Sequence, residues 1–255
     1  MATKKFKVIA CKVLLRELYL IASQTKATID VMSMRQELHN TPDLLRSTVQ
    51  AAIDSCENED ELYDAILLGY GLCSNGVVGL SSKKYPLVVP KGHDCITLLL
   101  GSKEKYKEIF DSFDGGIYWY STGWIESTMQ PGKERYETTL AQYTEKYGED
   151  NAQYLMEMEQ AWFTNYKAAV YVGWEKLHQP QHWDYTQECA QYLGWKCAAY
   201  TGDEGLLQDM LEGEWDSDRF VVLQPGESIK ATHDLEVLGA EPPCPNRTTN
   251  NSCTV

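Results

Sequence analysis

The chain contains 255 residues, with 37 acidic and 23 basic side chains and a formal net charge of -14. A polyanion would be repelled by this charge, so nucleic acid and an anionic membrane surface are not expected partners. A hydrophobic content of 43% and sixteen tyrosines exclude a disordered chain. No apolar run approaches the roughly 20 residues that a bilayer span needs, and residues 1–7 are polar where a secretory signal would turn hydrophobic. We therefore expect a cytoplasmic protein that buries a sizeable core.

Short apolar runs of the kind that form buried parallel strands recur along the chain. They cover residues 6–11, 28–32, 65–70, 87–89, 117–120, 168–172, 196–200 and 220–223. Helical patterns separate most of them, and parallel strands need crossover connections of that length. The order predicts an α/β fold, with a mostly parallel sheet and helices on both faces. Two Rossmann-like lobes are one form that such a fold could take.

Helix signals mark several connections. A helix is predicted to begin at Thr41-Pro42, where a capping residue precedes a proline. Another, opened by a capping box at Asp184, is predicted to end at Gly194. The long apolar pattern of residues 136–166 indicates two helices that join near a glycine, and a further helix is expected after residue 203.

The chain has no linker rich in serine, glycine or proline, so the domain division is drawn from the order of the elements. We place a boundary near residue 132, which gives an N-terminal α/β lobe of residues 1–132 and a C-terminal α/β lobe of residues 133–241. Residues 242–255 contain three prolines and several asparagines and threonines, which is typical of a poorly ordered tail.

A glycine-rich stretch, Gly69–Leu80, follows the third strand. In open α/β sheets, ligands bind where strands deliver such loops at their carboxyl ends. We predict that Gly71, Asn75 and Gly76 contact a cofactor, because glycine lets backbone approach a ligand and a helix opening after Gly76 would aim N–H groups at an anion. The spacing matches neither a P-loop nor a dinucleotide fingerprint. A tight turn with a packed thiol at Cys73 is the structural alternative.

A second polar segment, Lys91-Gly-His-Asp-Cys95, follows the fourth strand. It places an imidazole, a carboxylate and a thiol within one turn, where a strand hands over to a helix. His93 is therefore a candidate catalytic residue, whereas Asp94 is explained more simply as a helix cap. His39 follows the second strand and could reach the same place.

Three of the eight cysteines, Cys11, Cys73 and Cys95, lie at strand ends. The carboxyl ends of parallel strands share one edge of a sheet, so the three thiols could converge on one point. Three thiolates with an open fourth position suit a catalytic zinc or an iron–sulfur cluster. The chain has no Cys-x-x-Cys pair, and three buried structural cysteines remain the alternative.

Two aromatic loops each deliver a Gly-Trp pair and then a carboxylate. Trp124 and Trp174 could face each other across a cleft and hold a flat organic ligand. We predict a catalytic acid or base role for Glu126, which has Ser121 and Thr122 nearby, and a surface position for the matching Glu175. The other histidines are expected in solvated loops: His178, His182 and His233.

The linked motifs Gly69–Leu80, His93–Ser102 and Thr122–Glu126 resemble the DUF1638 family of bacterial and archaeal proteins, over about residues 7–229. The family has no assigned reaction. The resemblance implies an association, often in anaerobes, with gene neighbourhoods for corrinoid-dependent methyl transfer, and it matches the three strand-end cysteines to the family pattern. Lys91 stands where an arginine is expected, so the resemblance supports no bidentate guanidinium clamp.

These observations lead to two functional hypotheses. In the first, the protein binds zinc or an iron–sulfur cluster through its three cysteines and serves corrinoid-dependent methyl transfer or one-carbon metabolism. A small-molecule ligand and a corrinoid protein or methyltransferase would then be its partners, with the corrinoid supplied by the partner. In the second, the protein is a non-catalytic module that binds a small molecule or cofactor, and its cysteines are structural.

Overall fold

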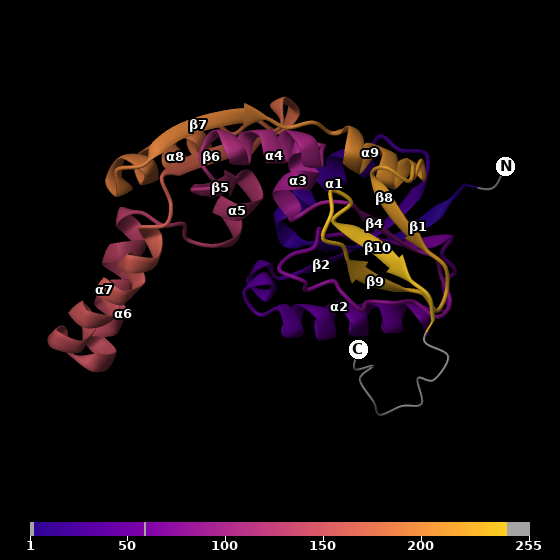
Figure 1. The fold of residues 1–255 in the computed structure, drawn as a ribbon, viewed down its shortest axis with the longest axis horizontal. Coiled ribbons are helices and arrows are strands. Elements are labelled where there is room, and N and C mark those ends of the chain that lie inside the picture. Colours follow the sequence, from indigo (N-terminus) through magenta and orange to yellow (C-terminus); the bar gives the residue numbers. More distant parts are fainter. Residues whose placement is uncertain (1–2, 59, 244–255) are drawn as a thin grey trace.

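The structure is a computed structural model that describes residues 3–58 and 60–243 (Figure 1). It is a mixed α/β fold, and all eight strands predicted from the sequence are present. The strands are β1 (Lys5–Cys11), β2 (Thr28–Met34), β3 (Ala65–Gly69), β4 (Leu87–Pro90), β5 (Ile117–Ser121), β6 (Ala168–Gly173), β7 (Lys196–Thr201), β8 (Phe220–Leu223), β9 (Ser228–Ala231) and β10 (Leu238–Glu241). The α-helices are α1 (Leu15–Ala22), α2 (Pro42–Glu57), α3 (Cys95–Leu100), α4 (Lys103–Ser112), α5 (Thr122–Ser127), α6 (Lys133–Tyr147), α7 (Glu149–Phe163), α8 (Pro180–Leu193) and α9 (Gly205–Glu212).

The larger sheet has the strand order β2-β1-β3-β4-β8. Its first four strands are parallel, and β8 runs antiparallel to β4 at the edge. Helix α2 lies on one face, and α1 and α9 lie on the other (Figure 1). Because both faces are covered, the central strands are buried throughout and show no polar alternation, as the continuous burial of residues 65–69 illustrates.

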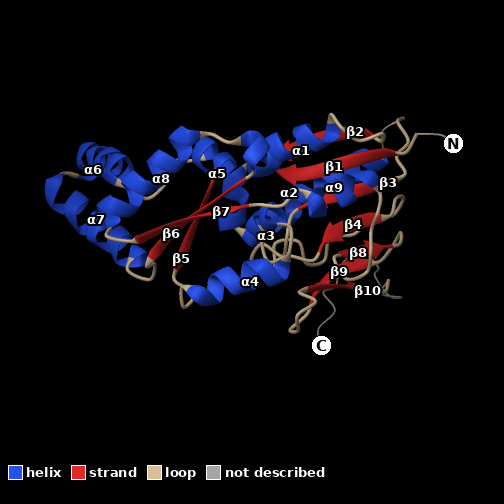
Figure 2. Cartoon of the chain, turned by 90° about the horizontal axis from the view of Figure 1, so that it is seen from above, coloured by secondary structure: helices blue, strands red, loops and turns tan. Residues whose placement is uncertain are grey.

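A second, smaller sheet has the order β5-β6-β7 and is parallel throughout. Helix α8 packs on β6 and β7, whereas the α6–α7 hairpin between β5 and β6 extends away from the rest of the molecule (Figures 1 and 2). The remaining strands, β9 and β10, form an antiparallel pair that the sequence did not predict. Their short polar runs lack the continuous hydrophobicity by which the other strands were identified.

The two sheets share the chain in an interleaved way. Strand β5 precedes residue 132 but pairs with β6, and β8 lies far beyond it but returns to β4. The domain boundary at residue 132 stays a prediction, and the strands on either side of it are distributed between both sheets.

Most local helix signals agree with the structure. Helix α2 begins at Pro42, α6 and α7 flank Gly148, and α9 follows Asp203. Gly194 ends α8 in the left-handed region at φ 69°, but that helix begins at Pro180, before the predicted cap at residue 184. In the described part of the chain, no helix combines the length and the hydrophobicity that a bilayer crossing needs.

The central strand β3 gives the most direct test of this core. Leu67 is completely buried there, whereas Leu62, five residues earlier, is 70% exposed. We expect Leu67→Ala to lower the free energy of unfolding by about 2–5 kcal/mol, since it removes buried methyl groups and leaves a cavity. Leu62→Ala should change it by less than about 0.5 kcal/mol. Urea denaturation followed by circular dichroism measures both, and equal effects would contradict the burial of β3.

Candidate functional site

The three strand-end thiols lie at the point where the strand order of the larger sheet reverses. Strand β1 has β2 on one side and β3 on the other, and ligands of open α/β sheets bind outside the carboxyl ends at such a switch point. A cavity of about 710 Å³ lies there, and Cys11, Cys73 and Cys95 all line it. Topology thus brings together residues that are distant in sequence.

Backbone hydrogen bonds join the two loops that carry Cys73 and Cys95. The N–H of Leu72 donates to the carbonyl of Gly92 over 2.8 Å, and the N–H of Cys73 donates to the carbonyl of His93 over 2.9 Å. A Cβ atom on Gly71 would lie only 2.6 Å from the backbone nitrogen of Asp94. The glycine therefore permits a close approach of the loops to each other, and Gly71 is not among the described residues that line the cavity.

The loop after β3 adopts a strained conformation. Cys73, Ser74 and Asn75 have φ angles of 45°, 55° and 66°, so three consecutive residues other than glycine occupy the left-handed region. That region costs such residues about 1–2 kcal/mol each, and strain of this kind clusters at functional sites. The helix predicted to open after Gly76 does not form, because residues 73–79 make successive turns instead.

The residues of this loop that line the cavity differ from those that the sequence analysis expected to contact a cofactor. Cys73 and Ser74 line the cavity. The carbonyl of Asn75 instead accepts a hydrogen bond from Arg46, and Gly76 packs against the side chain of Leu45. The glycine pattern identified the correct loop. Which of its residues line the cavity depends on the left-handed backbone conformation of residues 73–75.

The thiols carry their protons at neutral pH. Burial raises the pKa of Cys11 to about 11. Burial also raises the pKa values of Cys73 and Cys95, and in each case Cys11 and Asp94 add to the effect. The electrostatic influence of Cys11 on the other two thiols agrees with the position of all three at the wall of one cavity.

His93 lines the cavity with the thiols, as does His39. The His93 ring lies 5.6 Å from the ring of Tyr106, whose hydroxyl donates to the carboxylate of Asp94 over 3.1 Å. Asp94 caps α3 as the sequence predicted, since its side chain accepts hydrogen bonds from Ile96 and Thr97.

Aromatic side chains from β5, α5, α7 and the segment after α7 also line the cavity. They are Tyr118, Trp119, Trp124, Trp162 and Tyr166. Trp124, on α5, lies with its ring 5.1 Å from that of His39, and its side chain, near the Cys95 thiol, lowers the pKa of that thiol. Sequence reasoning identified Trp124 but missed Trp162, because a tryptophan in an amphipathic helix is ordinarily a packing residue.

Several residues that line the cavity carry a buried polar atom without a hydrogen-bond partner. Six such side-chain atoms occur among the described residues, and three belong to residues that line the cavity: the Gln36 carbonyl oxygen, the Tyr70 hydroxyl and the Trp124 indole nitrogen. Leaving a buried polar group unpaired costs about 1–3 kcal/mol, so such groups call for a partner such as a ligand or a water molecule. In the sequence, only their positions after the second and third strands would have pointed to Gln36 and Tyr70 as residues of the site.

The three cysteines are suited to a metal ion by their chemistry but not by their placement. Thiolates are the ligands that zinc and iron–sulfur clusters prefer, so the chemistry of the set is suitable. However, no group of three histidine, cysteine, aspartate or glutamate side chains in the described part of the chain is placed to hold a metal ion. The present side-chain positions therefore do not form a ready three-ligand centre.

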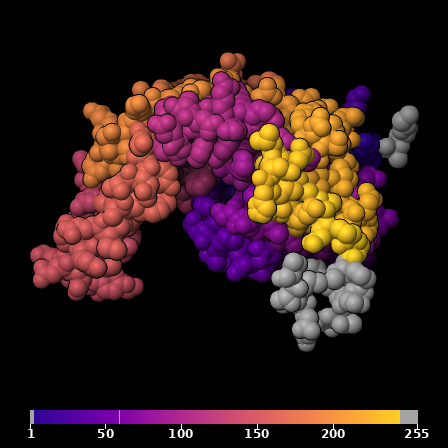
Figure 3. Space-filling model, viewed as in Figure 1, coloured from indigo at the N-terminus to yellow at the C-terminus, as the bar shows by residue number. Residues whose placement is uncertain are grey.

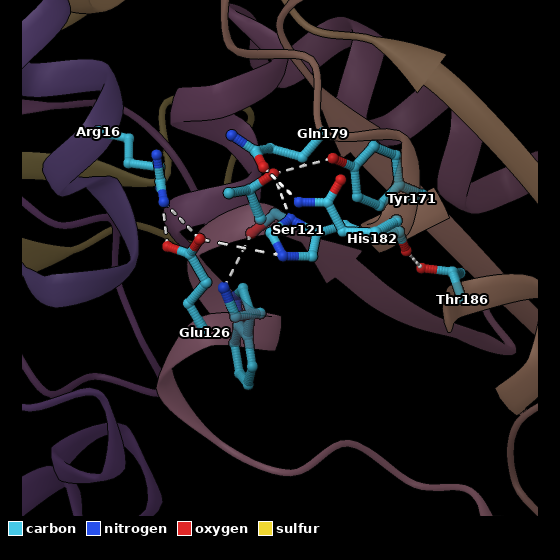
Figure 4. Close-up of polar contacts among 10 residues, drawn as sticks. Arg16, Ser121, Glu126, Tyr171, Gln179, His182 and Thr186 are labelled. Atoms are coloured by element: carbon cyan, nitrogen blue, oxygen red, sulfur yellow. Dashed lines mark hydrogen bonds and ion pairs between the residues drawn. The ribbon is translucent and has the colours of Figure 1, made fainter. Parts of the chain in front are cut away.

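Glu126, two residues after Trp124 on α5, takes part in a different cluster (Figure 4). Arg16 donates to its carboxylate from Nε over 2.8 Å and from Nη2 over 2.6 Å. His182 lies with Nε2 3.9 Å from the same carboxylate and Nδ1 3.2 Å from the hydroxyl of Thr122. His182 is only 9% exposed, so its predicted position in a solvated loop was wrong. Glu126 is not among the described residues that line the cavity.

The second aromatic loop does not face the first across the cleft. Trp174 is 5% exposed, and its indole N–H donates to the carbonyl of Leu99 over 2.9 Å. It is therefore a packing residue at the contact between β6 and α3. Glu175 begins a short 3-10 helix next to it, away from the described residues of the cavity wall.

The close approach of the two thiol loops can be tested at Gly71. We expect Gly71→Ala to lower the free energy of unfolding by about 1–3 kcal/mol, because its methyl group would collide with backbone rather than with a flexible side chain. Gly116→Ala is the matched control, since its nearest contact is the flexible side chain of Lys167 at 3.3 Å. Denaturant titration measures both variants, and a harmless Gly71→Ala would show that the loops can separate without cost.

Comparison with known proteins gives one match. The model of a family described as a protein of unknown function (DUF1638) matches residues 33–211, a segment that holds the left-handed loop, β4, α5 and the α6–α7 hairpin. No curated protein and no solved structure shows a significant match. Since the matched segment covers well over half of the chain, the protein belongs to the DUF1638 family.

Proposed function

We propose that the protein binds a small organic molecule or cofactor in the cavity lined by the three thiols. The observation that carries this proposal is the lining of that cavity, where three thiols at the switch point of the larger sheet meet a group of aromatic rings. Ligand sites are typically concave and mostly apolar, with a few polar groups that fix orientation.

The cavity also has the size and lining that such a ligand needs. Its volume of about 710 Å³ lies within the usual range of about 300–1,000 Å³ for sites of drug-sized molecules. Trp119, Trp162 and Tyr166 present rings that favour a flat ligand. Strain at residues 73–75 supports the same proposal, because the surrounding structure must maintain that conformation.

An aromatic probe tests the proposal without knowledge of the natural ligand. We expect 1-anilinonaphthalene-8-sulfonate to bind at one saturable site, measured by its fluorescence. Trp162→Ala should weaken that binding at least about tenfold, since it removes one ring from the wall. Tyr154→Ala is the matched control, because Tyr154 lies two turns earlier on α7, is 62% exposed and is not a lining residue. Equal effects of the two substitutions would place the probe elsewhere and contradict the proposal.

A thiolate-bound zinc ion or iron–sulfur cluster is the second candidate. The gathering of Cys11, Cys73 and Cys95 at one cavity favours it. Each cysteine has a single side-chain torsion before its sulfur, so the thiols could reorient toward an arriving ion with little backbone movement. When bound, a zinc ion could act as a Lewis acid and a cluster could carry electrons. The protein's own contribution would be to supply the thiolates and to shield them from water.

Metal analysis after anaerobic purification tests the second candidate. If it is right, the wild type should hold about one equivalent of zinc, or cluster iron, and Cys73→Ser should lose most of it. Cys197→Ser is the control, since Cys197 is exposed on β7. The thiols have raised pKa values, and metal binding must displace their protons, so the apparent zinc affinity should rise between pH 7 and pH 9. Less than about a tenth of an equivalent in the wild type would exclude a resident metal centre.

A metabolic role, a partner and a candidate acid or base can also be proposed for this site. We propose that the occupied site serves corrinoid-dependent methyl transfer or one-carbon metabolism in the cytoplasm, with the corrinoid brought by a partner protein or methyltransferase. The family resemblance alone supports this link. His93 remains the candidate acid or base, since it lines the cavity. The strand order β2-β1-β3-β4 supports a doubly wound, Rossmann-like description of the larger sheet.

A further inference from the structure

Helix α5 carries Trp124 toward the thiols on one face and Glu126 toward α1 on the other. We propose that the ion pair of Arg16 and Glu126 is a positioning contact, which holds α5 in place and thereby sets Trp124 against Cys95. Its consequence for ligand binding rests on the proposed function. The positioning itself is a property of the protein without ligand, and it can be tested separately.

Helix α5 is in direct contact with the segment after β1. A Cβ atom on Gly123 would lie 1.8 Å from the carbonyl oxygen of Val13, so α5 rests directly on the backbone of the turn at residues 12–14. That turn begins immediately after Cys11. Any displacement of α5 would therefore change the distance between Trp124 and the thiol wall.

Two hydrogen bonds and one ion pair hold α5 in this position. Ser121 accepts a hydrogen bond from the N–H of Trp124 over 3.3 Å, and the side-chain amide of Gln130 donates to the carbonyl of Trp124 over 2.9 Å. Ser121 ends β5 and Gln130 lies in the loop after α5, so both hold α5 from the side of the smaller sheet. The charged link to the larger sheet comes from Arg16 on α1, which binds Glu126 through two nitrogens (Figure 4).

The guanidinium of Arg16 contacts the carboxylate of Glu126 at two points. Exposed ion pairs usually contribute little, but a two-point contact between guanidinium and carboxylate fixes orientation as well as distance. Further groups surround it: His182 lies 3.9 Å from Glu126, and Glu17, 3% exposed, adjoins Arg16 on α1. We therefore assign the pair a local effect on α5 rather than a large effect on the free energy of unfolding.

Fluorine NMR of the ligand-free protein labelled with 5-fluorotryptophan tests the positioning role. The resonance of Trp124 is assigned from its loss in Trp124→Phe. We expect Glu126→Gln and Arg16→Gln to shift or broaden that resonance, and hydrogen exchange of residues 122–128 to become at least about threefold faster. The charge-reversed double variant, Arg16→Glu with Glu126→Arg, should restore both measurements toward the wild type.

Two controls separate this effect from general loosening. Asp111→Asn breaks the ion pair of Asp111 with Lys107 on α4, where both side chains are about 60% exposed, and should leave Trp124 unchanged. The resonance of Trp215, which packs on Phe6 in the larger sheet's core, should also stay constant in every variant.

Three results would overturn the inference: an unchanged Trp124 resonance in Glu126→Gln, equal changes at Trp124 and Trp215, or no restoration by charge reversal. The anilinonaphthalene titration reports the binding function independently. If Trp124 moves as expected while the probe finds no saturable site, the positioning role stands and the proposed function fails. If the probe binds at a saturable site while the Trp124 resonance does not respond to loss of the Arg16–Glu126 ion pair, the proposed function stands and the positioning role fails.

Discussion

The candidate site depends on the hydrogen bonds that join the backbone of the β3 loop to that of the β4 loop. They run from Leu72 to Gly92 and from Cys73 to His93, and they fix the two thiol-bearing segments side by side before any side chain is considered. Only a residue without a Cβ fits at position 71 in this arrangement. The left-handed path of residues 73–75 then turns the first loop back toward the cavity. Strain in one loop is thus balanced by its attachment to the other.

The cavity combines two surfaces of different chemistry. The larger sheet supplies soft, protonated thiols at its switch point, and the smaller sheet with its hairpin supplies aromatic rings. Neither surface would enclose a ligand by itself. Helix α5 lies where the two meet, in backbone contact with the turn after Cys11, and this placement makes the relation between the sheets part of the site (Figure 2).

Much of the fold could be predicted from the sequence, because buried parallel strands are continuous apolar runs and helix ends carry local signals such as Pro42, Gly148 and Gly194. The three thiols could be placed at strand ends for the same reason. The pairing of β5 with β6 and of β8 with β4 could not be predicted, since strand order depends on contacts between distant segments. The burial of His182 was missed because it rests on Thr122, sixty residues away. The unpartnered atoms of Gln36 and Tyr70 were not foreseen, because the hydrogen-bond partners of a side chain depend on residues that the fold brings near it.

The α6–α7 hairpin meets the cavity only at its base. Arg135, Trp162 and Tyr166 line the wall there. The rest of the hairpin projects from the molecule (Figure 3), and α6 buries none of its described side chains. Each helix can therefore gain or lose whole turns at the Gly148 end without moving the residues at the wall. The length of the hairpin can thus change independently of the shape of the cavity. Evolution or protein engineering could therefore alter what the hairpin contacts while the cavity at its base keeps its dimensions.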